Sequence, residues 1–143
     1  LLSCELELPV NNIWIMSKLI IDAANEKVFF MIIDNKGYYN ITHENSKNNY
    51  EKLILLINEF LKSKNLDLSK ISEIYVNRGP GSFAGIRNSL SVVKAIHMVK
   101  KIDFYCFSFA DFEGKSTVNY ENIPNLCTTL KIKKNLIKPI YLR

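Results

Sequence analysis

Apolar residues follow a strand-like pattern in three stretches near the start of the chain. Residues 18–24 form an apolar run interrupted only by Asp22, as expected for a buried central strand. Residues 28–34 and 37–43 follow it after short turns rich in Asn, Lys and Gly. Because such turns join antiparallel neighbours, the three stretches predict a β-meander with Asp22 near the tip of its first strand.

Two later stretches show a helical period instead. Residues 50–64 carry one main apolar stripe, which leaves Leu55 and Leu56 outside it. Residues 83–99 carry two stripes roughly 120° apart at the usual 100° per residue. The members of these two stripes are Ile86, Leu90, Val93 and His97, and Val92, Ile96 and Val99.

The two helices therefore have more apolar surface than one packed face requires, since a stripe somewhat over about 100° wide is enough. Either the second helix is deeply buried in a small fold, or the surplus docks on a partner. The residues expected at such a partner interface are Leu55, Leu56, Arg87, Leu90, Val92, Val93, Ile96 and Val99.

Two further strands are predicted at residues 71–76 and 104–109. The order of elements describes an α/β fold whose mixed five-stranded sheet has residues 18–24, 71–76 and 104–109 parallel. This is the ribonuclease-H-like lobe of the actin-like ATPase superfamily, with two main helices. After Asp111 the pattern weakens, and residues 126–136 could form a strand or a short helix.

The chain has 143 residues and a net charge of +5, which is moderate. We expect an irregular extension at residues 1–15, a lobe at 16–111 and a remnant of a second lobe at 112–143. The N-terminus lacks the lysines of a signal peptide and no apolar run is long enough for a membrane span, which indicates a cytoplasmic protein without membrane contact. The first residue is not Met, which suggests an upstream extension or a fragment boundary.

Charge and cysteine usage add little to this picture. The last thirty residues are the most basic, which fits either a solvated surface or nearby RNA, but no aromatic residues alternate with the lysines to stack bases. The three cysteines, Cys4, Cys106 and Cys127, lack the spacing of a disulfide framework or a zinc site.

The chain offers few groups for catalysis. A nuclease on this fold needs carboxylates at the ends of the first and fourth strands, but Asn77 and Arg78 follow the fourth. Asp22 marks the place of a possible degenerate nucleotide site, because Ala23 and Ala24 supply no hydroxyl beside it. Ser82 has no evident base, so helix capping is favoured over nucleophilic catalysis. We therefore predict no catalytic residue, no metal and a binding module.

A glycine-rich turn between the fourth strand and the second helix is the most informative string. Its glycines allow positive φ or close approach of another backbone, and Pro80 stiffens it. It matches neither a Walker loop nor the dinucleotide-binding spacing, so it is weak as a generic phosphate motif. The residues of this signature loop (residues 79–87) that we single out are Gly79, Pro80, Gly81, Ser82, Phe83, Gly85 and Arg87.

The string from Gly79 to Arg87 resembles the GPGSFTGLR signature of the TsaB (YeaZ) family, whose wider group carries the label peptidase M22-like (Gcp-like). Ala84 and Ile86 replace Thr and Leu of that signature, and Ala23-Ala24 replaces the family's usual Thr-Ser. Weaker similarity extends over residues 18–111 and reappears in the last six. The short C-terminal part puts contacts made by the family's second lobe in doubt.

The resemblance implies a non-catalytic scaffold in the synthesis of tRNA N6-threonylcarbamoyladenosine, a tRNA modification. It implies a heterodimer with TsaD through the lobe helices, recruitment of TsaE and indirect contact with tRNA. Self-pairing through the same helices is a further possibility of the family. It implies no cofactor bound by this chain alone, with ATP at the complex interface as an option. Two alternatives stay open: an ATP-binding actin-like ATPase or kinase, and a degenerate, non-functional family fragment.

Overall fold

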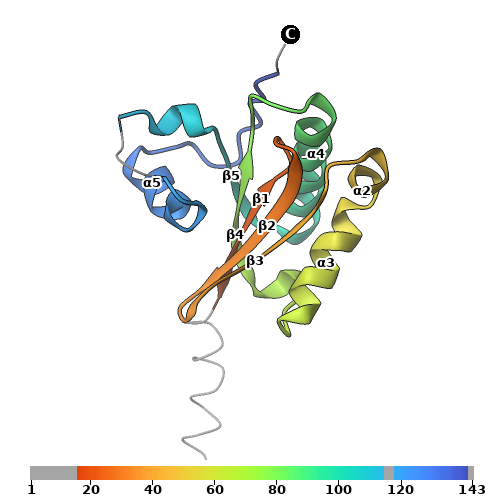
Figure 1. Ribbon diagram of the computed structural model, residues 1–143. Helices are drawn as coiled ribbons and strands as arrows, with labels where there is room; N and C mark the ends of the chain where they lie inside the picture. Colours follow the sequence, from red (N-terminus) through yellow and green to blue (C-terminus); the bar gives the residue numbers. More distant parts are fainter. Residues whose placement is uncertain (1–15, 115–117, 142–143) are drawn as a thin grey trace, which may run out of the picture.

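Five strands form one mixed sheet in the order β3-β2-β1-β4-β5 in the computed structural model, which describes residues 16–114 and 118–141. The first three strands form an antiparallel meander, and β4 pairs in parallel with both β1 and β5 (Figure 1). This topology confirms the predicted fold class. The strands are β1 (Ser17–Asp22), β2 (Lys27–Asp34), β3 (Gly37–Glu44), β4 (Ile71–Asn77) and β5 (Asp103–Phe107).

The register brings the carboxyl ends of the parallel strands together. Ile21 of β1 lies opposite Val76 of β4, so Asp22 and Asn77 end neighbouring strands at the same edge. Because the ends of parallel strands share one edge of a sheet, this is where ligand-binding groups gather in open α/β folds. The signature loop begins at Gly79, two residues after Asn77.

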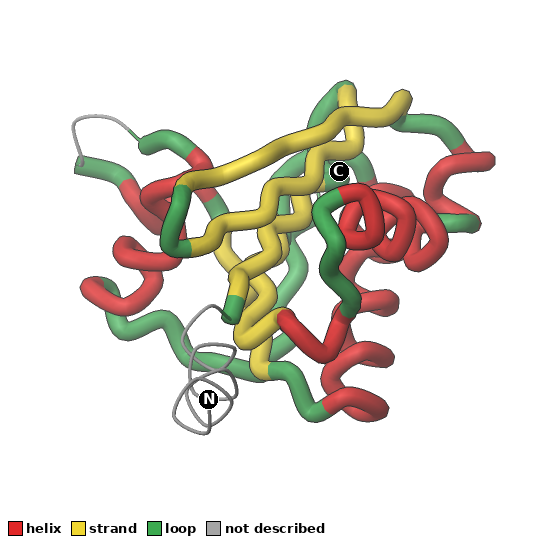
Figure 2. The backbone as a smooth tube through the Cα atoms, turned by 90° about the horizontal axis from the view of Figure 1, so that it is seen from below, coloured by secondary structure: helices red, strands yellow, loops and turns green. Residues whose placement is uncertain are grey.

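Three helices cover one face of the sheet. They are α2 (Lys47–Glu51), α3 (Leu53–Ser63) and α4 (Phe83–Lys100), and Figure 2 shows them gathered on one side of the strands. Residues 50–64 are therefore not one helix. The chain breaks at Lys52, whose φ of −124° and ψ of 30° are not helical, and its N–H donates to the Asn49 carbonyl. α3 therefore starts at Leu53, and Leu53, Leu56 and Leu61 face the core from it.

The other face of the sheet is covered by the C-terminal part of the chain. A short 3-10 turn (Phe109–Phe112) is followed by another (Tyr120–Asn122) and by α5 (Ile123–Thr129), which lies across the sheet from α4 in Figure 1. Of the two options for residues 126–136, a short helix is observed over the first four residues only, because α5 begins at Ile123 and ends at Thr129. Their core consists of Ile20, Met31, Tyr75, Phe107, Phe112, Ile123 and Cys127.

Residues 1–15, including Cys4, lie outside the described residues. No helix among the described residues has the length and apolar character to cross a membrane. The division at residue 111 stays a prediction, although residues on both sides of that point share the core of the second face.

Candidate functional site

Ser82 organises the signature loop as the N-cap of α4. Its Oγ accepts from the backbone N–H of Gly85 at 3.1 Å, and the Tyr50 hydroxyl lies 3.0 Å from the same oxygen. Its own N–H donates to the Ala24 carbonyl at 2.8 Å. The serine is therefore fully engaged in fixing α4 against α2 and the β1–β2 turn, which agrees with the predicted capping role.

Gly85 and Gly81 allow the loop to touch the β1–β2 turn. A Cβ at Gly85 would overlap the carbonyl oxygen of Ala23, and a Cβ at Gly81 would overlap that of Ala24. The cost of a glycine in the first helical turn is therefore explained by close approach of another backbone, as the sequence suggested. The groups that approach these glycines are carbonyl groups of the same chain, and not a ligand.

Gly79 joins the loop to the C-terminal strap, the name used here for residues 130–141. Its φ of +106° lies in the region that favours glycine, and a Cβ there would overlap the Ile140 carbonyl oxygen. The Arg78 carbonyl accepts from the Ile140 N–H at 2.7 Å. The positive φ of Gly79 thus allows the loop to pack against Ile140, near the end of the described chain.

Asp22 is completely buried, and its carboxylate is occupied by internal donors. The Ala24 N–H donates to Oδ1 at 3.0 Å, while the Asn25 amide donates to Oδ2 at 3.1 Å. The Tyr120 hydroxyl donates to Oδ2 at 2.6 Å. Burial, followed by the nearby Asp22 charge, raises the pKa of Tyr120, so the phenol stays protonated as a donor.

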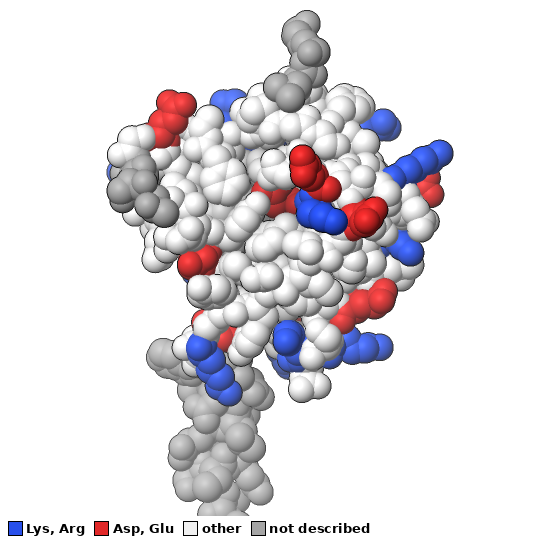
Figure 3. Space-filling model, viewed as in Figure 1, with Lys and Arg blue, Asp and Glu red and all other residues white. Residues whose placement is uncertain are grey.

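A broad cleft of about 1040 Å³ opens beside this carboxylate. Phe29 and Tyr120 stack at 4.1 Å between ring centroids in its wall. Its lining residues are Ala24, Asn25, Glu26, Lys27, Phe29, Thr42, Asn45, Gly81, Ser82 and Tyr120. On the face of the molecule drawn in Figure 3, basic and acidic side chains are interspersed, and neither sign of charge dominates.

The polar residues at the end of β4 make contacts within the protein that stabilise the fold. The Asn77 Oδ1 accepts from the Gly79 N–H at 2.8 Å, and the Arg78 guanidinium pairs with Asp111 at 2.7 Å. No group of three or more His, Cys, Asp or Glu able to hold a metal occurs among the described residues. The cleft therefore offers hydrogen-bonding and stacking groups. Whether the chain is catalytic stays a prediction.

The predicted interface residues divide into buried and accessible sets. Leu56, Leu90, Val93 and Ile96 are core residues, at most 7% exposed. Their inclusion in the interface is corrected, because Leu56 lies three residues after Leu53 and four before Phe60 on the buried side of α3, and α4 is more deeply buried than one stripe requires. Leu55, Arg87 and Val99 are exposed, and Val92 is half-buried.

Sequence reasoning missed an apolar groove of about 430 Å³ between α4 and the C-terminal strap. Met98, 61% exposed, lines it on the helix, and Ile137, Pro139 and Tyr141 line it on the strap. At its end Phe83 packs against Tyr141, with ring centroids 4.7 Å apart. The only available signal was the apolar character of Phe83 and Met98 on the polar sector of α4.

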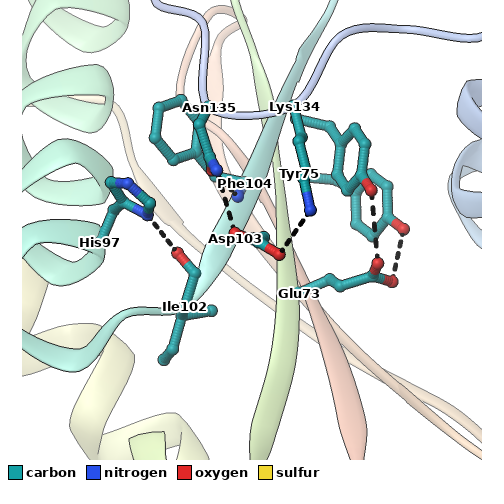
Figure 4. A network of polar contacts seen from close by, with 9 residues as sticks. Glu73, Tyr75, His97, Ile102, Asp103, Phe104, Lys134 and Asn135 are labelled. Atoms are coloured by element: carbon teal, nitrogen blue, oxygen red, sulfur yellow. Dashed lines mark hydrogen bonds and ion pairs between the residues drawn. The ribbon is translucent and has the colours of Figure 1, made fainter.

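A polar network holds the strap against β5 (Figure 4). The Phe104 N–H donates to Asn135 Oδ1 at 2.9 Å, and the Asn135 amide donates to Asp103 at 2.9 Å. Lys134 lies 3.3 Å from the same carboxylate. The Asn135 hydrogen bond, and after it the Lys134 contact, lower the pKa of Asp103.

The two described cysteines are buried and free. Burial raises the pKa of Cys106 to about 11 and that of Cys127 to about 12. Since the thiolate is the reactive form, both are inert at neutral pH. These two thiols therefore serve packing in the core.

A protein-family model described as "TsaD: tRNA N6-adenosine threonylcarbamoyltransferase" matches residues 40–128. Two curated relatives are each described as "tRNA threonylcarbamoyladenosine biosynthesis protein TsaB". The one from Buchnera aphidicola subsp. Baizongia pistaciae is 31% identical over 80 residues, which are 56% of this chain and 36% of the relative. The one from subsp. Schizaphis graminum is 23% identical over 90 residues, 63% and 43% of the two chains.

Solved structures show the same fold. YeaZ from Pseudomonas aeruginosa superimposes with a TM-score of 0.59 at 20% identity, covering 64% of this chain and 43% of that one. A second solved protein, with similarity to the peptidase YEAZ from Pseudomonas aeruginosa, gives a TM-score of 0.60 at the same identity and coverage. At this identity the likeness concerns architecture alone.

The sheet, its helices and the loop after β4, together with the matching family model, define a ribonuclease-H-like, actin-like fold. The match over residues 40–128 and the two relatives are specific beyond that fold. The chain belongs to the TsaB (YeaZ) family, within the group that the TsaD-type family model describes. Its matched segments span only 36% and 43% of those curated relatives.

Proposed function

We propose that this chain is a non-catalytic subunit in tRNA N6-threonylcarbamoyladenosine synthesis that pairs with TsaD through the outer side of α3 and α4. The observation that carries the proposal is a set of apolar side chains that the chain itself leaves uncovered. Leu55 is 58% exposed and Val99 75% exposed, on adjacent helices. Exposed apolar surface of this kind typically marks a protein interface.

The state of the cleft supports a scaffold over an enzyme. Asp22 ends β1 beside the cleft, and three internal donors already bind its carboxylate. Ala23 and Ala24 add no hydroxyl. In this proposal the transfer to adenosine in tRNA takes place on TsaD, in the cytoplasm, and TsaE joins the pair.

Co-expression with TsaD from the same source tests the proposal. We expect a heterodimer by light scattering, and we expect Val99→Asp or Leu55→Asp to weaken pairing at least tenfold by desolvating a charge in the interface. Ile96 is unsuitable for this purpose, because it is 5% exposed and an acid there would unfold the lobe.

Tyr38→Asp is the matched control, since Tyr38 is 50% exposed on β3, away from these helices. It should pair normally. Retained pairing in both helix variants would contradict the proposed interface.

Tight ATP binding by the isolated chain in calorimetry would favour the ATPase alternative, and failure to restore the modification in cells lacking TsaB would favour a degenerate fragment. A homodimer of the isolated chain that the same variants disrupt would show self-pairing.

A further inference from the structure

The positive charge of the chain is concentrated in its C-terminal part. The chain has 19 basic and 14 acidic residues, and the last acidic residue is Glu121. Five basic residues follow it: Lys131, Lys133, Lys134, Lys138 and Arg143. Because these five equal the whole net charge of +5, residues 1–121 are electrically balanced. The excess charge is thus located on or next to the C-terminal strap.

The strap is held in a fixed position on the lobe. The Asn135 N–H donates to the Phe104 carbonyl at 2.7 Å, and the Phe104 N–H donates to the Asn135 Oδ1. Farther along, Arg78 accepts from Ile140 and donates to the Lys138 carbonyl at 3.3 Å. The lysines are therefore presented from an ordered backbone, which lowers the entropic cost of engaging a ligand.

The acidic side chains that meet the strap are already neutralised. Asp103 pairs with Lys134 at 3.3 Å, and Asp111 pairs with Arg78 at 2.7 Å. Lys131, Lys133 and Lys138 are exposed and form no ion pair within the described parts of the chain. They can therefore attract an external anion without first breaking a contact.

The groove beside the strap adds a surface suited to nucleobases. Arg87 and Lys94 rim it from α4, while Ile137, Pro139 and Tyr141 form its strap side. Tyr141 is 39% exposed and packs against Phe83 at the end of the groove. Basic side chains beside an exposed aromatic ring are the combination with which proteins hold phosphates and stack unpaired bases. This combination could not be recognised in the sequence, because the rings of Phe83 and Tyr141 are 58 positions apart.

We propose that the C-terminal strap and its groove with α4 bind RNA, with Lys131, Lys133, Lys138, Arg87 and Lys94 on phosphates and Tyr141 against an unpaired base. RNA fits better than an acidic protein segment, because the cations extend along the strap beyond the apolar groove. The choice of tRNA as the RNA rests on the proposed function. The binding of a phosphate backbone does not.

Fluorescence anisotropy with unfractionated tRNA, on the full chain alone and paired with TsaD, tests the proposal. The test variant carries Lys131→Gln, Lys133→Gln and Lys138→Gln. The control carries Lys36→Gln, Lys47→Gln and Lys64→Gln, exposed lysines away from the strap that give the same change in net charge. We expect the test variant to bind roughly tenfold or more weakly at about 0.1 M salt, with a slope of log K against log salt reduced by about two to three.

A separate Tyr141→Ala variant should weaken binding of a single-stranded oligonucleotide about tenfold and leave the salt slope unchanged, as expected for lost stacking. Equal affinities of the test and control triple variants for tRNA would overturn the proposal. So would a test variant that binds tRNA normally but no longer pairs with TsaD, since the strap would then be a protein-docking surface. If Val99→Asp abolishes pairing while the strap variants alone lose tRNA, both proposals stand. If pairing is never seen but the strap variants lose tRNA, only the proposed function fails.

Discussion

Gly85 shows how a single hydrogen atom sets the distance between α4 and the sheet. Its N–H is 3.1 Å from the capping oxygen of Ser82, and its Cα faces the Ala23 carbonyl with no room for a methyl group. From the sequence alone, a glycine in the first turn of a helix is a penalty without an evident cause. The structure supplies the cause, which is contact between two backbones far apart in the chain.

Replacing Gly85 with Ala therefore separates two physical effects of opposite sign. Helix propensity alone predicts a gain of about 1 kcal/mol in the free energy of unfolding. Overlap with Ala23 predicts a net loss of about 1–3 kcal/mol. We expect the loss, measured by urea unfolding. Ser91→Ala, at an exposed position of the same helix, should change stability by less than about 0.5 kcal/mol. A stabilised Gly85→Ala variant would contradict the close approach.

Among the elements, those with a strong local period could be predicted and those fixed by tertiary contacts could not. All five strands and α4 lie within a few residues of their predicted ranges, because β-branched runs and an uninterrupted helical period specify them locally. The break at Lys52 has no local signal, whereas the burial of Leu56 follows from its helical spacing from Leu53 and Phe60. The strap is irregular, and its position depends on Asn135 reaching Asp103 and Phe104.

The attachment of the strap should depend on pH through Asp103. Its pKa is lowered from 3.8, so the carboxylate contributes stability that is present above 3.8 and lost as the pH falls through the lower folded value. We expect the difference in unfolding free energy between the natural chain and Asp103→Asn to shrink below pH 3.8. Urea titrations at pH 7 and below pH 3.8 measure it. A difference that is independent of pH would exclude this role.

At the scale of the whole molecule, the sheet is buried on both faces by different parts of the chain. Helices α2, α3 and α4 cover one face, and the described residues of segments 109–114 and 118–132 cover the other. The sequence indicated the first layer through its helical stripes. The second layer was only an undecided segment, since its polar composition and short turns gave no periodic signal. The candidate site was likewise predicted only in part. Its glycines identified the loop, whereas the contacts that Tyr120 and Ile140 make with it could not be predicted from the sequence.

A chain that ends after residue 111 should not fold as a stable unit. It would uncover Ile20, Met31, Tyr75 and Phe107, all at most 3% exposed in the full chain. We expect loss of cooperative thermal unfolding and association in size-exclusion chromatography, because a large apolar face would meet water. The full chain is the reference. A monomeric fragment with a sharp transition would instead support residues 112–143 as a separate remnant.

The hydrogen bond between Tyr120 and Asp22 joins residues 98 positions apart. On a ribosome, which releases the N-terminal strands first, the buried carboxylate emerges long before its phenol partner. Until residue 120 leaves the exit tunnel, Asp22 must be satisfied by water or by some other donor. The wall of the cleft that Tyr120 forms is therefore completed only after residue 120 has emerged, and the Asp22 carboxylate gains its phenol donor at that point.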